Sequence, residues 1–172
     1  MKKLIIAAAA LAVATTATSA AAQAVSSTPR AQANARLIKP LVLTSDRGLN
    51  FGTIVMGTLT GNETVSISQA GAVTCGSSGN LVCSGSPTSA RYTVTGTQGQ
   101  VVVISSSAAS FTLNNLTQAG SLTLVPSFPT SLTLGNSGAP GNTFTVGGSV
   151  TIGTATTDGV YQGEIDIQVA YQ

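Results

Sequence analysis

The chain contains no histidine, and charged residues make up only 7% of its 172 positions. Without an imidazole it lacks the commonest general base and the base of Ser-His-Asp and Cys-His arrangements. Two cysteines without histidine also cannot complete a tetrahedral zinc shell unless carboxylates join them. The few lysines and arginines are scattered, so no basic surface for nucleic acid is indicated. We therefore expect no catalytic residue, no metal, no other cofactor and no nucleic-acid partner.

Two fragments could still carry chemistry. The stretch G-N-S-G-A-P at residues 135–140 superficially resembles the box around the nucleophile of chymotrypsin-like proteases, but no imidazole is present to activate Ser137. Glu164 and Asp166 share the polar face of one expected strand and could form a carboxylate pair. The sequence favours a loop between strands at the first position and a solvated strand face at the second.

The N-terminus has the pattern of a cleaved signal peptide. It begins Met-Lys-Lys, continues with an apolar stretch over residues 4–13, and ends in Ala-Gln-Ala at residues 22–24, so cleavage between Ala24 and Val25 is predicted. About ten strongly apolar residues are too few to span a bilayer, and no other segment could span one as a helix. The sequence thus predicts an exported protein of the periplasm, outer-membrane surface, fimbrium or extracellular space.

After the leader, two further parts are expected. Residues 25–36 contain no bulky apolar side chain beyond Val25 and include one proline, which is typical of a flexible extension. Ala31, Ala33 and Ala35 alternate there with polar residues, which is a strand pattern that buries little. Residues 37–172 are expected to form one domain.

Cys75 and Cys83 are the only cysteines, and the segment between them is rich in glycine and serine. In an exported chain the expected state is a disulfide that closes a small loop.

Short apolar runs, enriched in β-branched residues and separated by Gly, Asn, Ser or Pro, recur roughly every 8–12 residues, as in an antiparallel sandwich or barrel. A turn is expected at residues 45–48. The predicted strands are 37–43, 49–56, 64–68, 72–75, 91–95, 101–104, 111–113, 121–125, 131–134, 143–146, 149–152 and a closing strand from 161.

The closing strand has the clearest pattern. Its odd positions are apolar and its even positions mostly polar, which predicts a half-buried antiparallel strand. Its apolar positions are Tyr161, Ile165, Ile167, Val169 and Tyr171.

This end of the chain resembles the C-terminal signature of chaperone–usher pilin subunits, which has a penultimate tyrosine (Tyr171), a glycine fourteenth from the end (Gly159) and alternating apolar residues between them. More broadly, L-N-F-G-T-I at 49–54, Y-T-V-T-G at 92–96 and F-T-V-G-G-S-V-T-I at 144–152 resemble a bacterial domain family of unknown function composed of secreted, pilin-like β-sandwich proteins.

The resemblance implies an immunoglobulin-like sandwich with Greek-key connections that lacks one strand. It implies a periplasmic chaperone and an outer-membrane usher as partners, and a homo-polymer in which the extension of a neighbouring subunit supplies the strand. The alternative is a self-complete sandwich, in which the strand at 37–43 fills the gap. Such a protein would act as a periplasmic or cell-surface binding module, with carbohydrate as one ligand class.

Overall fold

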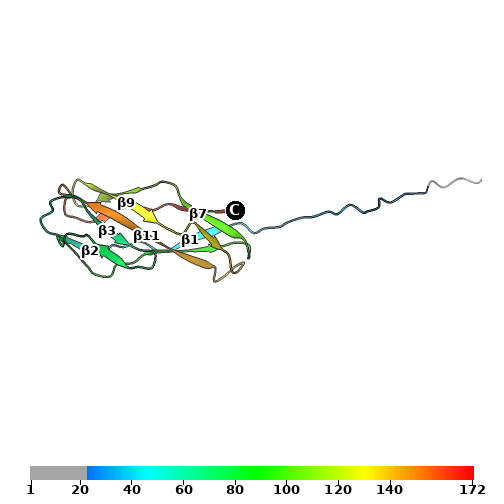
Figure 1. Cartoon of the computed structure of the whole chain (residues 1–172), viewed down its shortest axis with the longest axis horizontal. Helices are drawn as coiled ribbons and strands as arrows, with labels where there is room; N and C mark the ends of the chain where they lie inside the picture. The colour runs from blue at the N-terminus through cyan, green and yellow to red at the C-terminus, as the bar shows by residue number, and fades with distance from the viewer. Residues whose placement is uncertain (1–22) are drawn as a thin grey trace, which may run out of the picture. The chain divides into compact units, whose positions relative to one another are not determined.

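The computed structural model describes residues 23–172, and its regular structure is entirely β-strand. The chain divides into two compact units, Met1–Arg36 and Leu37–Gln172. In the first unit, residues 23–36 are exposed and form no strand. The predicted signal peptide lies outside the described residues except for its last two positions. All the strands lie in the second unit, and Figure 1 labels several of them.

The strands are β1 (Val42–Arg47), β2 (Thr53–Met56), β3 (Glu63–Ile67), β4 (Val73–Cys75), β5 (Leu81–Ser84), β6 (Ala90–Thr95), β7 (Val101–Ser106), β8 (Phe111–Asn115), β9 (Ser121–Ser127), β10 (Ser131–Thr133), β11 (Asn142–Ile152), β12 (Tyr161–Gln162) and β13 (Ile167–Tyr171). Every pair of strands is antiparallel. The predicted all-β, antiparallel class is therefore confirmed.

The longest strand, β11, holds the largest sheet together. Its first half pairs with β6, with Phe144 opposite Tyr92, and its second half pairs with both β3 and β9. Gly147 lies between the halves, where a Cβ would collide with the main-chain oxygen of Ile67. Only glycine lets the two backbones approach this closely. The sheet order is β1-β6-β11-β9-β8-β12, with β3 and β4 added beside β11.

Two apolar cores form on the two halves of this sheet. One contains Tyr92 and Phe144, whose rings stack with centroids 5.5 Å apart, together with Ile167 of the last strand. The other contains Leu124 and Val150. A three-stranded sheet, β10-β7-β13, and a two-stranded sheet, β2-β5, complete the unit.

Several predicted strand boundaries are wrong, including the start of β2, which is Thr53 and not residue 49. The first strand begins at Val42, not at residue 37, and continues through the predicted turn to Arg47. It continues because β6 pairs with it across a bulge at Asp46, whose carboxylate accepts a hydrogen bond from Thr93 Oγ1 at 2.6 Å. The runs 143–146 and 149–152 are one strand, β11. The closing strand is interrupted at residues 163–166, which leaves the short β12 and the longer β13.

Candidate functional site

The C-terminal strand β13 lies at the edge of its sheet. Its side chains alternate as predicted, with Ile167 buried, Val169 and Tyr171 half-buried, and Gln168 and Ala170 exposed. β13 pairs with β7, and no strand pairs with its other edge within the described part of the chain. The site is built around this open edge.

Along β13, the backbone N–H and C=O groups of successive residues point alternately toward β7 and toward the open edge. Ser107 N donates to Asp166 O and Gln172 N donates to Val101 O, both at 3.1 Å. Even-numbered residues therefore face β7, because opposite residues of an antiparallel pair alternate between bonded and non-bonded positions. It follows that the N–H and C=O groups of Ile167, Val169 and Tyr171 point to the open edge.

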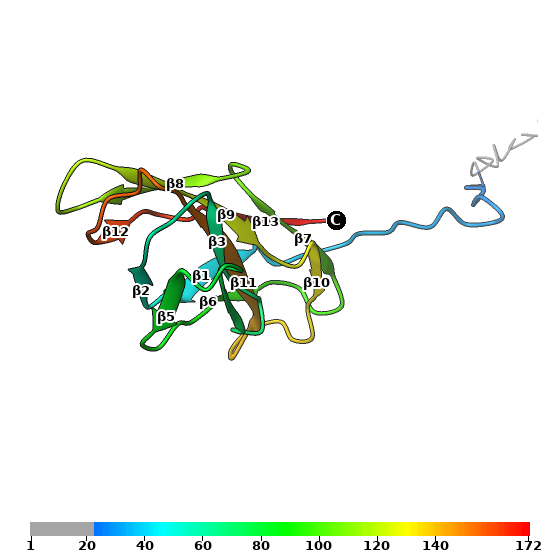
Figure 2. The ribbon, with the colours of Figure 1, turned by 60° about the vertical axis from the view of Figure 1, so that its left-hand side comes forward.

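Three other strands also keep one edge open. In residues 23–172, β1 pairs only with β6, β2 only with β5, and β12 only with β8. Figure 2 shows β2 and β12 at the end of the unit away from the C-terminus. Residues of β1 and β2 line one side of the opening between these edges, and residues of β12 and the start of β13 line the other.

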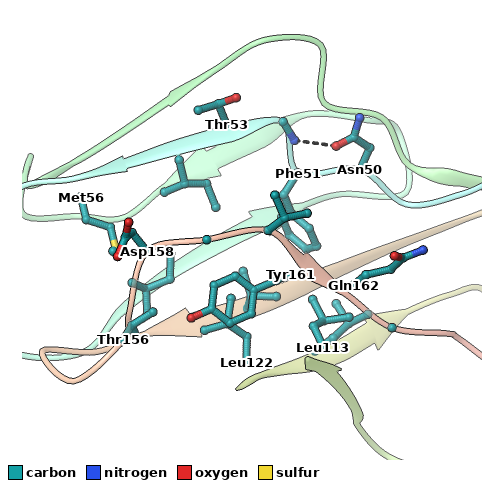
Figure 3. A pocket seen from close by; sticks show the side chains of 18 of the residues that line it. Asn50, Phe51, Thr53, Met56, Leu113, Leu122, Thr156, Asp158, Tyr161 and Gln162 are labelled. Carbon is teal, nitrogen blue, oxygen red and sulfur yellow. Dashed lines mark hydrogen bonds between the residues drawn. The ribbon is translucent and has the colours of Figure 1, made fainter. Parts of the chain in front are cut away.

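Two adjoining cavities, of about 720 and 560 Å³, occupy the space between these edges. Both are lined by Leu49, Gly163 and Ile165, so we treat them as one groove, defined by residues 43–56 on one wall and 156–167 on the other. Leu49 and Ile165 also pack against both cores. Figure 3 shows side chains of the larger cavity, including Phe51, Leu113 and Tyr161. The groove therefore opens onto core-type apolar side chains.

The groove carries negative charge on one wall. Asp158 lines the larger cavity, Glu164 and Asp166 line the smaller one, and all three are exposed. Tyr92 lines the smaller cavity as well, and burial is the main reason why its pKa is raised above the usual value. The wall can thus attract cations, while Tyr92 stays neutral at physiological pH.

Tyr171 ties the end of the chain to the residues that precede β1. Its hydroxyl donates to Lys39 O and accepts from Thr97 N, each at 2.7 Å. Gly96 leaves room for this hydroxyl, since a Cβ there would meet it. The penultimate tyrosine therefore fixes the point where the chain enters the folded unit.

Gly159, the other half of the predicted signature, lies in a turn and not in a strand. Its φ of +142° is one that other residues rarely adopt, and a Cβ would meet Asn115 and Thr117. The Asn115 side chain holds this turn by donating to Asp158 O at 2.9 Å. The glycine thus allows the chain to turn into β12 beside the groove.

The predicted disulfide between Cys75 and Cys83 is present and joins the ends of β4 and β5. Glu63 Oε2 accepts a hydrogen bond from Ser77 N, 2.8 Å away, inside the closed loop. Hydrogen bonds from the Ser78 side chain and the Ser77 backbone lower the pKa of Glu63. The bridge links β4 to β5, a strand that the sequence did not predict because it lies within a Gly/Ser-rich region.

Replacing both cysteines by serine should lower the free energy of unfolding by about 2–3 kcal/mol, because the cross-link restricts the unfolded chain. Urea denaturation with and without reductant measures the effect. Reductant should shift the midpoint of the wild-type protein to that of the Cys75→Ser/Cys83→Ser variant and leave the variant unchanged. Equal midpoints for the oxidised wild type and the variant would contradict the prediction.

The other sequence candidates do not converge on a reactive centre. Ser137 Oγ accepts a hydrogen bond from Gln98 N at 2.8 Å, and Lys39 Nζ donates to the Ser137 carbonyl at 3.1 Å, so this serine connects loops. Among the described residues, no group of three or more His, Cys, Asp or Glu side chains could hold a metal ion. The same residues include no helix of the length and apolar character needed to cross a bilayer.

Sequence reasoning identified one wall of the groove and missed the other. Tyr161, Ile165, Ile167, Val169 and Tyr171 were predicted to lie on one face. The opposite wall, which includes Leu43, was not recognised as part of a site. The sequence does restrict this run to an edge strand, a strand end or a bulge, because it contains Pro40, but it does not show that the run faces a groove.

These features define an all-β, disulfide-containing domain with antiparallel sheets and a groove between open strand edges. The chain belongs to the family described as "Domain of unknown function (DUF4402)", which matches residues 41–171. The predicted membership of a domain family of unknown function is thereby confirmed. No curated protein matches the chain, and no solved structure does.

Proposed function

We propose that this protein is a non-catalytic, exported structural subunit that assembles by β-strand addition into a fimbria-like polymer. Its folded unit acts as an immunoglobulin-like sandwich that lacks one strand, and the groove is the place of that strand. A periplasmic chaperone and an outer-membrane usher are the partners that such a subunit would use before the neighbouring subunit supplies the strand.

The observation that carries the proposal is the pair of open edges around an apolar groove. Unpaired backbone N–H and C=O groups along an edge are a template for another strand. On β13 these groups belong to Ile167, Val169 and Tyr171. An incoming strand would satisfy them, and its inward side chains would cover the apolar lining.

The segment that fits the groove is residues 25–36 of another copy. Its odd positions are apolar or small, as at Val25, Ala31 and Ala33, while its even positions are polar. The small inward residues suit a groove whose walls include the half-buried Ile165 and Leu49. Residues 23–36 are exposed and form no strand, so this segment is not already part of a sheet.

Amide hydrogen exchange tests the proposal at single-residue resolution. The mature chain, residues 25–172, is exchanged as a dilute monomer and in the assembled state, then quenched, dissolved and analysed by NMR. Assembly should slow exchange at the amides of Ile167, Val169 and Tyr171. The amides of Gln168 and Ala170, which already face β7, serve as internal controls and should change little.

Two results would overturn the proposal. One is a mature chain that stays monomeric at every concentration tested after signal-peptide removal. The other is an assembled state in which the odd-numbered amides of β13 exchange as fast as in the monomer, because the groove would then be empty.

A further inference from the structure

The exposed large apolar side chains of the folded unit fall into two groups. The first group consists of valines within strands, namely Val42, Val55, Val73, Val82, Val103 and Val125. Valine favours strands, so the exposure of these side chains follows from their place in a strand. The second group, within residues 37–172, lies outside every strand and consists of Leu37, Ile38, Leu116 and Val160. Strand preference does not explain their exposure.

Leu37 and Ile38 form what we call the entry patch, at the start of the folded unit. Their side chains are 87% and 51% exposed. The next residue, Lys39, is held by its backbone, because its N–H donates to Thr97 Oγ1 at 2.6 Å and its carbonyl accepts from Tyr171 Oη at 2.7 Å. The entry patch is therefore fixed beside the Tyr171 end of the groove.

Leu116 and Val160 form what we call the mouth patch, and their side chains are 61% and 60% exposed. Leu116 N donates to Val160 O at 2.8 Å, which joins the two loops. The Asn115 side chain fixes both loops, since it donates to Asp158 O and accepts from Thr117 N, each at 2.9 Å. Val160 lines the larger cavity, and β12, which follows it, lies at the end of the unit away from the C-terminus (Figure 2). The mouth patch is thus a fixed apolar surface where the groove ends.

The Tyr171 end of the groove is occupied by the receiver's own chain. The Tyr171 hydroxyl and Leu41 both lie over Gly96, where a Cβ would meet them, and the hydroxyl is bonded to Lys39 O. A second folded unit placed at this end would meet the receiver's own entry patch. The donor's folded unit therefore belongs at the Val160 end, so that the donated strand runs antiparallel to β13.

The extension is long enough to reach from one end of the groove to the other. Residues 25–36 and the wall from Val160 to Tyr171 contain twelve residues each. The wall is interrupted at residues 163–166, so it is no longer than an unbroken strand with the same number of residues. An extended donor segment can thus start beside β13 and end at Val160. The residues that follow it, Leu37 and Ile38, then reach the mouth patch.

We infer that Leu37 and Ile38 of one copy pack against Leu116 and Val160 of the copy that receives its extension. This inference rests on the proposed function and adds a second contact between subunits, outside the groove. Each patch would remove the other's apolar surface from water, which stabilises the contact. The two patches lie at opposite ends of one copy, so each copy makes the contact once as donor and once as receiver. The assembly is then head to tail and open.

Introduced cysteines test the contact directly, because both native cysteines are joined in a disulfide. The assembled mature protein with Ile38→Cys and Val160→Cys is treated with a short bis-maleimide. Successive copies should be joined, which gives a ladder of covalent multimers on a denaturing gel. The matched control pairs Ile38→Cys with Val125→Cys, at an exposed valine of β9, and should give no ladder. Leu37→Cys with Leu116→Cys is a second pair at the same contact and should also give a ladder.

Serine substitutions measure what the contact contributes to assembly. Ile38→Ser and Val160→Ser should each raise the concentration needed for half-maximal assembly about three- to ten-fold, because each removes apolar surface from the contact. The double variant should show much less than the product of the two effects, because both changes remove the same contact. Val125→Ser should stay within about two-fold of the wild type. Light scattering of the mature protein measures all four variants.

The outcomes separate this inference from the proposed function. Covalent dimers from Ile38→Cys alone would mean that two entry patches meet, and would overturn the inference. Equal ladders from the Val160 and Val125 pairs would also overturn it. Assembled protein that gives no ladder with either contact pair, while the β13 amides are protected, would overturn the contact and leave strand addition intact. A wild-type mature chain that does not assemble would remove both.

Discussion

Deleting residues 25–36 is expected to leave a folded monomer that does not polymerise. The deletion removes the strand that would fill a neighbour's groove, but it leaves untouched the strands, both cores and the disulfide, all of which lie in Leu37–Gln172. Size-exclusion chromatography with light scattering measures assembly, and circular dichroism checks the fold. Polymers of unchanged length formed by the deleted protein would contradict strand exchange through this segment.

A pair of lysine substitutions makes a sharper control than the deletion. Ala33→Lys places a charge at an inward position of the extension, where it would be buried in the groove, and assembly should be lost. Asn34→Lys adds the same charge at the neighbouring, outward position, and assembly should be retained. Equal behaviour of the two variants would show that the alternating face of the extension is not what the groove recognises.

The second large effect is expected at Tyr171. Tyr171→Ala should lower the free energy of unfolding by about 3–4 kcal/mol, because it removes a half-buried ring and leaves Thr97 N and Lys39 O without their partner. Tyr171→Phe keeps the ring and should cost about 1–2 kcal/mol. Urea denaturation of the mature protein measures both changes.

The neighbouring Gln172 supplies the matched control for this prediction. Its side chain is exposed, and the hydrogen bond it makes to Val101 comes from its backbone N–H, which Gln172→Ala preserves. This variant should unfold at the wild-type midpoint. If Tyr171→Ala did so as well, the tyrosine would have no part in fixing the chain before β1.

The sequence predicted the features that depend on local pattern. The alternation of Ile167, Val169 and Tyr171 identified a half-buried strand because side chains of a strand point to opposite faces in turn. The disulfide was predicted because only Cys75 and Cys83 were available to form one. Antiparallel pairing was predicted because the apolar runs are short and are separated by turn residues.

The groove itself could not be predicted, because it depends on which strands pair at long range. Nothing local indicates that β1 pairs only with β6, or that β13 keeps one edge open. The extent of β1 was wrong for the same reason. Its last residues, Asp46 and Arg47, are polar, so no apolar pattern marks them as a strand. They belong to the sheet because they pair with β6. The interruption before β13 is likewise not visible in the alternation, which continues through Ile165.

The position of β11 has a consequence for how the chain folds. It lies late in the sequence, yet β6, β3 and β9 all pair with it. These earlier strands cannot complete their sheet until residues 142–152 are present, so no large part of the domain should be stable during synthesis. Contacts this distant along the chain are formed slowly. If the chain is exported as proposed, it should accordingly stay unfolded, and so able to pass through a narrow translocation pore, until residues 142–152 have been made.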